Sequence, residues 1–419
     1  MREMKRSEIE WIRDIPSNWS VMPNKYLMHK KKTICPVYNG EDILSLTMNG
    51  VIVRDLEAGG KMPSSFDGYQ KLEPGNLLMC LFDIDVTPRC IGLIKQSGVT
   101  SPAYSQFVLN SEIADASYYS YYYTMLDNDK TLLHLAKNLR HSLTEDQLGA
   151  VPTVVPPIDE QKKIARFLDE KFEIIASIIS DIQAQIETLE NYKRSIIINV
   201  TTKGLNSEAS FRDSGIEYVG EIPAHWSVHP VYFYFGERKH KNILGREENL
   251  LSLSYGKIVR KDINTSDGLL PASFNTYNIV EADDIVIRPT DLQNDKKSLR
   301  TGLVREHGII TSAYIDLMPI KPVNTAYFHY LLHSFDVMKV FYNMGNGVRQ
   351  GLNFSEFSRL MVFEPPLDEQ NAIVNYLDSK CSEIDNVIAD KKEQISTIEA
   401  YKKSLIYEYV TGKKEVPVA

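Results

Sequence analysis

The stretch PPIDEQKKIARFLDEKFEIIASIISDIQAQIETLENYKRSIIINVTT, residues 156–202, decides the fold because the chain contains it twice. The second copy, PPLDEQNAIVNYLDSKCSEIDNVIADKKEQISTIEAYKKSLIYEYVT, occupies residues 365–411. Aligned without gaps at an offset of 209, the two copies share 21 identities over 47 positions. This identity is far above that expected from composition alone, so the chain contains an internal duplication.

Each copy predicts one long helix with a defined start. A Pro-Pro pair cannot lie inside a helix, and Asp159 and Asp368 follow it as predicted N-caps. The Glu-Gln pair after each aspartate suits the positive end of the helix dipole. About 40 residues at roughly 1.5 Å each give a rod of roughly 60 Å.

Apolar residues at alternating steps of four and three predict a heptad seam along both helices. The interruptions Lys171 and Gln185, matched by Lys380 and Gln394, would fix the register if the two helices pack on each other. The alternative is that each helix lies only on its own domain. The predicted seam residues are Ile164, Leu168, Ile175, Ile178, Ile182 and Leu189 in the first copy, and Ile373, Leu377, Ile384, Val387, Ile398 and Leu405 in the second.

The duplication extends beyond the helices. Ile15-Pro16 and Trp19 recur as Ile222-Pro223 and Trp226, and Leu44-Ser45-Leu46 recurs as Leu251-Ser252-Leu253. The chain is therefore expected to hold two copies of a unit made of a globular domain and a long helix. The predicted boundaries are a first domain at 1–155, a central helix at 156–206, a second domain at 207–364, a C-terminal helix at 365–412 and a tail at 413–419.

The globular parts predict an α+β fold. Short β-rich runs at residues 76–82 and 284–287 are bounded by turn residues, whereas residues 117–138 and 325–342 have helical patterns. Five tyrosines between residues 118 and 123 would point in all directions on a helix. Most of them are expected in the core or an interface, and base stacking is the less favoured alternative.

Composition limits the classes of protein to consider. The chain of 419 residues is long enough for two to four domains, has a net charge of −8 and contains no run of 18 apolar residues. With no apolar signal segment at its start, we expect a cytoplasmic protein. Its four cysteines form no Cys-x-x-Cys pair, which argues against a structural metal. Any DNA-binding surface must be a local basic patch.

Motifs for catalysis are missing from the sequence. It has no phosphate-binding Gly-rich loop and no Asn-Pro-Pro-aromatic tetrapeptide of the kind found in amino-methyltransferases. Asp291, Asp295 and Lys297 have the residue types of a metal-dependent nuclease, but their spacing within one loop is too tight for ligands that usually come from separate strands. We therefore predict no catalytic residues, no metal and no cofactor in this chain.

Basic residues at matching positions of the two units are the candidates for DNA contacts. Lys30, Lys31 and Lys32 follow Trp19 at about the distance at which Arg238, Lys239 and Lys241 follow Trp226. A solvated surface with no such role is the alternative. Divergent loops add Arg89 in the first unit and Lys296, Lys297 and Arg300 in the second. Arg140 and Arg349 precede the two Pro-Pro pairs, either as phosphate anchors or as caps of the domain against its helix.

At the level of motifs the chain resembles the specificity subunits of type I restriction-modification enzymes. The resemblance spans nearly the whole chain. It rests on the Ile-Pro-x-x-Trp opening of each unit, the Pro-Pro-[Ile/Leu]-Asp-Glu-Gln helix start, the Tyr-Lys-x-Ser segment near each helix end, and the Val-Thr that follows it.

The resemblance implies two target-recognition domains, each reading one half of a bipartite asymmetric DNA site. It also implies that the two long helices form an antiparallel coiled-coil spacer and dock two methylation subunits, which restriction subunits join. In such a complex S-adenosylmethionine, ATP and Mg²⁺ are bound by the partner subunits. The chain would be the non-catalytic part of a restriction endonuclease and adenine methyltransferase.

Two other readings of the sequence remain open. The first is a coiled-coil scaffold for protein assembly without sequence-specific DNA binding. The second is a self-sufficient nuclease or methylase. Salt-sensitive DNA binding argues against the scaffold, and turnover by the chain alone would support the enzyme.

Overall fold

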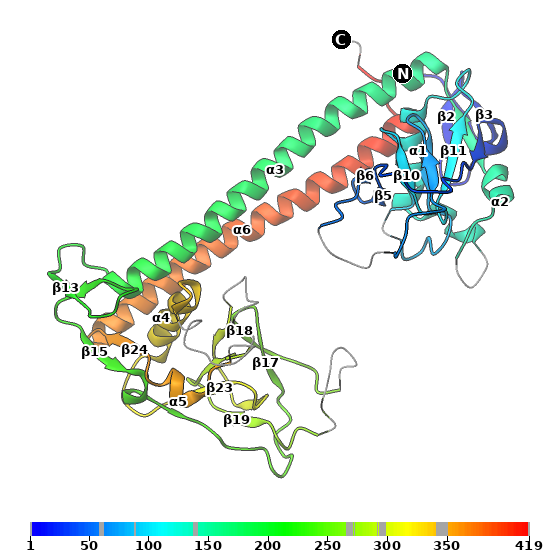
Figure 1. Cartoon of the computed structure of the whole chain (residues 1–419). Helices are drawn as coiled ribbons and strands as arrows, with labels where there is room; N and C mark the ends of the chain where they lie inside the picture. The colour runs from blue at the N-terminus through cyan, green and yellow to red at the C-terminus, as the bar shows by residue number, and fades with distance from the viewer. Residues whose placement is uncertain are drawn as a thin grey trace. The chain divides into compact units, whose positions relative to one another are not determined.

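The computed structural model describes residues 2–57, 63–87, 89–136, 141–264, 271, 273–290, 292, 299–340 and 351–417. Two compact units divide the chain: unit 1 contains residues 1–182 and 392–419, and unit 2 contains residues 183–391. The long helices α3 (Ile158–Lys203) and α6 (Leu367–Val410) each contribute one end to each unit. Figure 1 shows them in green and orange.

Unit 1 is built on a four-stranded antiparallel sheet with the strand order β4-β11-β8-β9. Unit 1 also contains the helices α1 (Ala116–Asn128) and α2 (Glu145–Ala150) and the 3-10 turns η1 (Asn24–Tyr26) and η2 (Thr131–Leu135). Two-stranded pairs join β1 to β2, β3 to β12, β5 to β6 and β7 to β10. The strands are β1 (Met4–Arg6), β2 (Asp14–Pro16), β3 (Ser20–Pro23), β4 (Met28–Lys31), β5 (Leu44–Thr47), β6 (Gly50–Val53), β7 (Gln70–Leu72), β8 (Leu77–Met79), β9 (Ile91–Leu93), β10 (Gly98–Thr100), β11 (Ser105–Leu109) and β12 (Pro152–Val155).

Unit 2 repeats this plan with a sheet in the order β16-β23-β20-β21. Its shorter helices are α4 (Thr325–Val337) and α5 (Phe354–Phe357), and its 3-10 turn is η3 (Val231–Phe233). The strands are β13 (Phe211–Asp213), β14 (Glu221–Pro223), β15 (Ser227–Pro230), β16 (Phe235–Glu237), β17 (Leu251–Ser254), β18 (Lys257–Arg260), β19 (Asn278–Val280), β20 (Ile285–Ile287), β21 (Thr301–Leu303), β22 (Gly308–Ile310), β23 (Ile315–Pro319) and β24 (Met361–Glu364). The expected α+β architecture with two similar domains and two long helices is confirmed.

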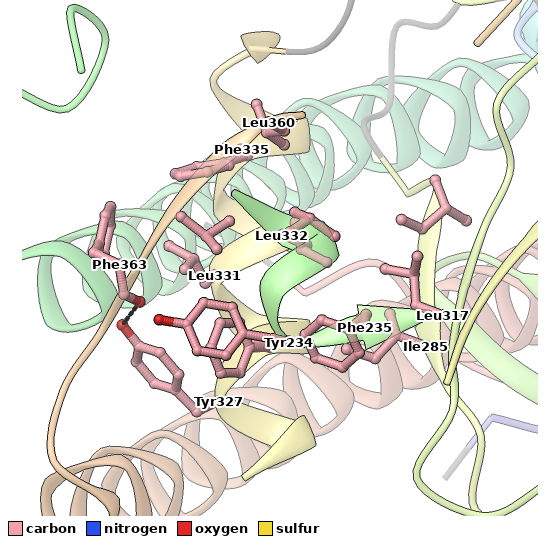
Figure 2. Close-up of a cluster of buried hydrophobic side chains, with 14 of the residues drawn as sticks. Tyr234, Phe235, Ile285, Leu317, Tyr327, Leu331, Leu332, Phe335, Leu360 and Phe363 are labelled. Carbon is pink, nitrogen blue, oxygen red and sulfur yellow. Dashed lines mark hydrogen bonds between the residues drawn. The ribbon is translucent and has the colours of Figure 1, made fainter. Parts of the chain in front are cut away.

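The core of unit 2 joins the sheet, α4 and both long helices. Figure 2 shows Phe235 of β16 and Leu317 of β23 beside Leu331 and Leu332 of α4. Residues from the end of α3 and from the start of α6 complete the same cluster, and those are Ile197, Val200, Ile373, Val374, Leu377 and Cys381. Burying such side chains contributes about 1.5–3 kcal/mol each, which makes the helix ends part of the domain core.

The tyrosine cluster of unit 1 is core, as expected. Tyr118, Tyr119, Tyr122 and Tyr123 on α1 are each at most 3% exposed, and the pairs Tyr118–Tyr119 and Tyr122–Tyr123 pack in T-shaped, edge-to-face contacts. Tyr121 faces α3 instead, and its hydroxyl donates to Asp169 at 2.5 Å. Burial, with the nearby Asp169 carboxylate, raises its pKa. These rings are therefore occupied by packing rather than available for base stacking.

Candidate nucleic-acid interface and helix seam

The Asp-Glu-Gln start of α3 connects the helix to the first domain. Trp19 Nε1 donates to Glu160 Oε2 at 3.0 Å, and Arg2 donates to the same oxygen at 2.9 Å. Gln161 accepts from the backbone nitrogen of Asp115 at 2.8 Å and donates to the carbonyl of Pro156 at 2.9 Å. These bonds explain why the Trp and Glu-Gln motifs occur together.

The second copy makes the same contacts. Trp226 Nε1 donates to Glu369 Oε2 at 3.1 Å, while His225 lies 2.8 Å from that oxygen in the place of an arginine. Gln370 accepts from the backbone nitrogen of Asn324 at 2.9 Å and donates to the Pro365 carbonyl at 2.8 Å. The motif is thus a duplicated joint between domain and helix, a role that the sequence pattern alone did not reveal.

The predicted N-caps, Asp159 and Asp368, are wrong by two residues. Helices α3 and α6 begin at Ile158 and Leu367, so Asp159 and Asp368 lie inside the first turn. The fixed φ of proline is already suited to a helix start, and the carbonyl of Pro157 accepts from the backbone nitrogen of Glu160 at 2.9 Å. The two aspartates still suit the positive end of the helix dipole.

The far end of each long helix packs on the domain of the other repeat. The Tyr118 hydroxyl donates to the carbonyl of Val410 at 2.7 Å, and Gly412, with φ +71°, lies against Trp19. In unit 2 the Tyr327 hydroxyl donates to Thr201, and Gly204, with φ +73°, lies against Trp226. The two repeats therefore exchange their helix ends.

Inside each unit the helices run antiparallel. In unit 1 the rings of Phe167 and Tyr409 are 4.6 Å apart, and Lys402 lies over Phe172 at 5.0 Å. In unit 2 Lys193 bonds Asp385 at 2.7 Å. Lys391 donates to Gln185 at 2.5 Å. Contacts that advance along α3 move back along α6, as expected for an antiparallel pair.

One predicted seam residue on each long helix lies one position away from the seam. Ile178 and Val387 are each 43% exposed and are wrong as seam positions, whereas Ile179 and Ile388 face inward. The other predicted residues are buried, except Leu189 and Ile398, which are half-buried. The inward positions are Phe172, Ile175, Ile179, Ile182, Ile186, Leu189 and Lys193 on α3, and Cys381, Ile384, Ile388, Lys391, Ile395, Ile398 and Lys402 on α6.

The reason for this error is geometric. Two heptad registers share positions such as Ile175 and Ile182 and differ by one residue at the positions between them. The observed register carries more apolar residues than the predicted one, with Phe172 and Ile186 in place of Lys171 and Gln185. Lys171, Gln185 and Gln394 are exposed, and the Lys380 side chain is 41% exposed. They flank the seam instead of interrupting it, so the polar seam positions are Lys193, Lys391 and Lys402.

A one-sided apolar flank follows from the corrected register. Ile178 and Val387, with Tyr192 and Tyr401 at 57% and 55% exposure, occupy the heptad position beside the seam. Within each unit the helices are antiparallel, so this position of both helices lies on one side: Ile178 and Tyr401 in unit 1, and Tyr192 and Val387 in unit 2. Asp169, which bonds Tyr121 of α1, lies on the opposite side. Helices α3 and α6 are fully described, and all of their exposed large apolar residues except Leu367 belong to this flank. We call these residues the apolar flank: Ile174, Ile178, Tyr192, Tyr376, Val387 and Tyr401.

The basic candidates of unit 1 differ in solvent exposure and in their ion pairs. Lys32 is exposed, Lys31 pairs with Glu73 at 2.6 Å, and Lys30 lies 3.8 Å from Glu145. Arg89 is mostly buried and donates to Asp127 and Asn128 at 3.2 and 3.0 Å. Arg89 therefore fastens its loop to α1 in this structure.

The candidates of unit 2 show the same contrast. Lys239 is exposed and pairs with Glu237 at 2.8 Å, and Lys241 donates to the Thr276 carbonyl at 3.0 Å. Arg238 donates two hydrogen bonds to the carboxylate of buried Asp284. Burial lowers the pKa of Arg238, but the hydrogen bonds and the charge of Asp284 outweigh this effect and raise the pKa overall.

Arg300 is a special case among the candidates. It is only 5% exposed, and its guanidinium donates to the carbonyls of Arg288 and Thr290. Arg300 thus holds the backbone of residues 288–290 from inside the domain. Arg140, Lys296, Lys297 and Arg349, as well as Asp291 and Asp295 of the nuclease alternative, lie outside the described residues.

The described residues show neither a metal-binding cluster nor a membrane-spanning helix. In the part of the chain that the structure describes, no three His, Cys, Asp or Glu side chains are arranged to hold a metal ion. Among the same residues, no helix combines the length and apolar character needed to cross a membrane.

Two curated relatives match the chain in sequence, both from Methanocaldococcus jannaschii, whereas no family model matches it. A protein named as the type I restriction enzyme MjaX specificity subunit is 28% identical over 281 residues, which cover 66% of this chain and 62% of the relative. The type I restriction enzyme MjaVIII specificity subunit is 25% identical over 279 residues, 62% of each chain. The matches thus span less than two thirds of the length of either relative.

Solved structures match over almost the whole chain. A chain from a structural study of assembly and conformational transition of the type I restriction-modification system is 12% identical and has a TM-score of 0.69, covering 96% of this chain and 99% of that one. The HsdS subunit from Thermoanaerobacter tengcongensis is 13% identical with a TM-score of 0.51, covering 96% and 98%.

The fold and the exchanged helix ends define a class: two-repeat α+β proteins in which each domain is completed by the helix of the other repeat. The curated relatives that match this chain in sequence are specificity subunits of type I restriction enzymes. The resemblance indicated by the motifs is therefore confirmed.

Proposed function

We propose that this chain recognises a bipartite, asymmetric DNA sequence and directs methylation and restriction subunits to it, without a catalytic centre of its own. Residues 1–155 and 207–364 would be the two target-recognition domains, with 156–206 and 365–412 as spacer helices and 413–419 as a tail. The observation that carries the proposal is the duplicated joint, because two similar domains with different loops suit two different half-sites.

The exposed lysines are the favoured phosphate contacts. Lys32 and Lys239 lie at equivalent places, just past β4 and β16, and both extend into solvent. Each phosphate contact contributes about 0.9 to the slope of log affinity against log salt concentration. Lys30, Lys31, Arg238 and Lys241 are proposed as lesser contributors, while Arg89 and Arg300 are proposed to position the loops that read bases. The proposal extends to Arg140, Lys296, Lys297 and Arg349 from sequence alone.

The apolar flank is the proposed docking surface for methylation subunits. Equivalent residues occur in both units, with Ile178 matching Val387 and Tyr192 matching Tyr401. Exposed aromatic and aliphatic side chains on one side of a helix pair are typical anchors of protein interfaces. Two equivalent copies of the surface suit two methylation subunits. S-adenosylmethionine, ATP and Mg²⁺ would be bound by the partners, and we propose that the complex acts in the cytoplasm.

A methylation map and a binding titration test the function. We expect a gapped methylated motif to disappear from the genome when the gene is deleted, and the purified complex to bind that motif with strong salt dependence. Lys32→Ala and Lys239→Ala should each lower the salt slope by about 1, whereas Lys392→Ala, on the polar side of α6, should not. An unchanged methylation map, or binding that is insensitive to salt, would favour the scaffold. Turnover by the chain alone would favour the self-sufficient enzyme.

A further inference from the structure

The second unit buries two carboxylates at one end of its sheet. Asp284, just before β20, is 0% exposed, and Asp316 in β23 is 1% exposed. Arg238, just past β16, donates its backbone nitrogen to the carbonyl of Asp316 at 2.9 Å. Because β16, β23 and β20 are neighbours in the sheet, the three residues come together.

The two carboxylates differ in their hydrogen-bond partners. Asp284 accepts from Arg238 Nε at 2.6 Å and from the backbone nitrogen of Glu281 at 2.8 Å. Neither carboxylate oxygen of Asp316 has a hydrogen-bond partner among the described residues, and both oxygens are fully enclosed. A buried carboxylate without a partner costs several kcal/mol if ionised, so it takes up a proton instead.

The surrounding charges agree with a protonated Asp316. Burial is the largest cause and, with the charges of Asp284 and Glu237, raises the pKa of Asp316 to about 8, while Arg238 acts in the opposite direction. Glu237 itself bonds Lys239 at 2.8 Å. The other acid that faces Arg238 and Asp284 is Glu281, which lies 2.9 Å from His307.

The first unit builds the same place from neutral groups. Asn76 and Gln106 stand where unit 2 has Asp284 and Asp316, and the amide of Asn76 donates to Gln106 at 3.1 Å. Gln106 in turn donates to the carbonyl of Lys71 at 3.1 Å. Lys31, the counterpart of Arg238, bonds Glu73 on the surface. The first unit therefore has no ionisable pair at this place, because Asn76 and Gln106 are both neutral amides.

We propose that a proton on the Asp284–Asp316 pair locks the sheet end that presents residues 238–241 in the second unit, and that the first unit lacks this control. Loss of the proton leaves a second buried negative charge beside Arg238 and loosens this end of the sheet. Any consequence for DNA contact through Lys239 and Lys241 rests on the proposed function. The lock itself is a property of the free chain and is tested without DNA.

The sign of the effect follows from proton linkage. An unfolded Asp316 ionises near its ordinary pKa, whereas the folded one keeps its proton up to about pH 8. The folded unit therefore binds more protons between these limits, and its stability falls as pH rises through that window, then levels off. One proton corresponds to a change of up to about tenfold in the opening equilibrium per pH unit.

Hydrogen exchange of the full chain, read by mass spectrometry from pH 5.5 to 8.5, measures this opening. After correction for intrinsic exchange, we expect peptides from β20 and β23 to open more readily with each pH unit and then to level off near pH 8. Peptides from β8 and β11 are the internal control and should stay level. Equal pH dependence of the two sets would overturn the proposal.

Two variants make the test specific. Asp316→Asn should remove the pH dependence of β20 and β23, and retention of the wild-type dependence would sink the idea. If this variant fails to fold, Asp284→Asn decides, because it frees Arg238 to pair with Asp316 and should move the pH window to lower values. An unmoved window in Asp284→Asn would equally count against the lock.

Discussion

Two isoleucines three residues apart on α3 should have opposite roles. Ile175 is 7% exposed and belongs to the core of unit 1, whereas Ile178 is 43% exposed on the apolar flank. Replacing a buried Ile by Ala typically costs about 2–5 kcal/mol, while an exposed position stays within about 0.5 kcal/mol. Ile175→Ala should therefore destabilise unit 1 strongly, and Ile178→Ala should leave its stability almost unchanged. Urea unfolding followed by circular dichroism measures both free energies.

Docking should show the reverse order. Ile178→Asp places a charge on the proposed interface, and we expect at least about a fivefold loss of affinity for the methylation subunit, equal to roughly 1 kcal/mol, with normal stability. Ile384 and Val387, at 7% and 43% exposure, form the matched pair in unit 2 and should repeat the result. Equal destabilisation by Ile175→Ala and Ile178→Ala would refute the corrected register. Full assembly of Ile178→Asp would refute the docking surface.

Three further predictions concern other parts of the chain. A fragment of residues 1–206 should form a dimer, seen by light scattering, because the end of α3 lies against Trp226 as the end of α6 lies against Trp19; a stable monomer would contradict the exchange of helix ends. Gly412→Ala should lower the free energy of urea unfolding by well over about 1 kcal/mol, because φ is +71° and a Cβ would lie 2.5 Å from Pro16. Gly75→Ala is the control: its φ is +85° and no described atom lies within 4 Å, so it should lower that free energy only by the backbone cost of about 1 kcal/mol. Tyr118→Phe should lower stability by about 1 kcal/mol through loss of the bond to Val410, and no change would show that this bond contributes nothing.

The repeated motifs acquire their meaning only from contacts between distant residues. Trp19 and Glu160 are far apart in sequence, and their hydrogen bond gave no local signal beyond the fact that both residues are duplicated. The same holds for the basic residues. Arg238 and Arg300 have the residue type of a DNA contact, yet one is bound to Asp284 and the other is enclosed by carbonyls. Residue type indicates a possible role, and only the surrounding fold shows whether the side chain is free for it.

The sequence by itself determined the duplication, the α+β class and the two long helices, because proline, heptad spacing and alternation are local patterns that act through the backbone. Only the tertiary structure decided between the two readings of the seam, since steps of four and three fit Ile178 and Ile179 equally well until the partner helix occupies one side. It also decided that α6 ends on the first domain and α3 on the second. That exchange depends on packing between residues hundreds of positions apart, such as Tyr118 and Val410, which no local pattern encodes.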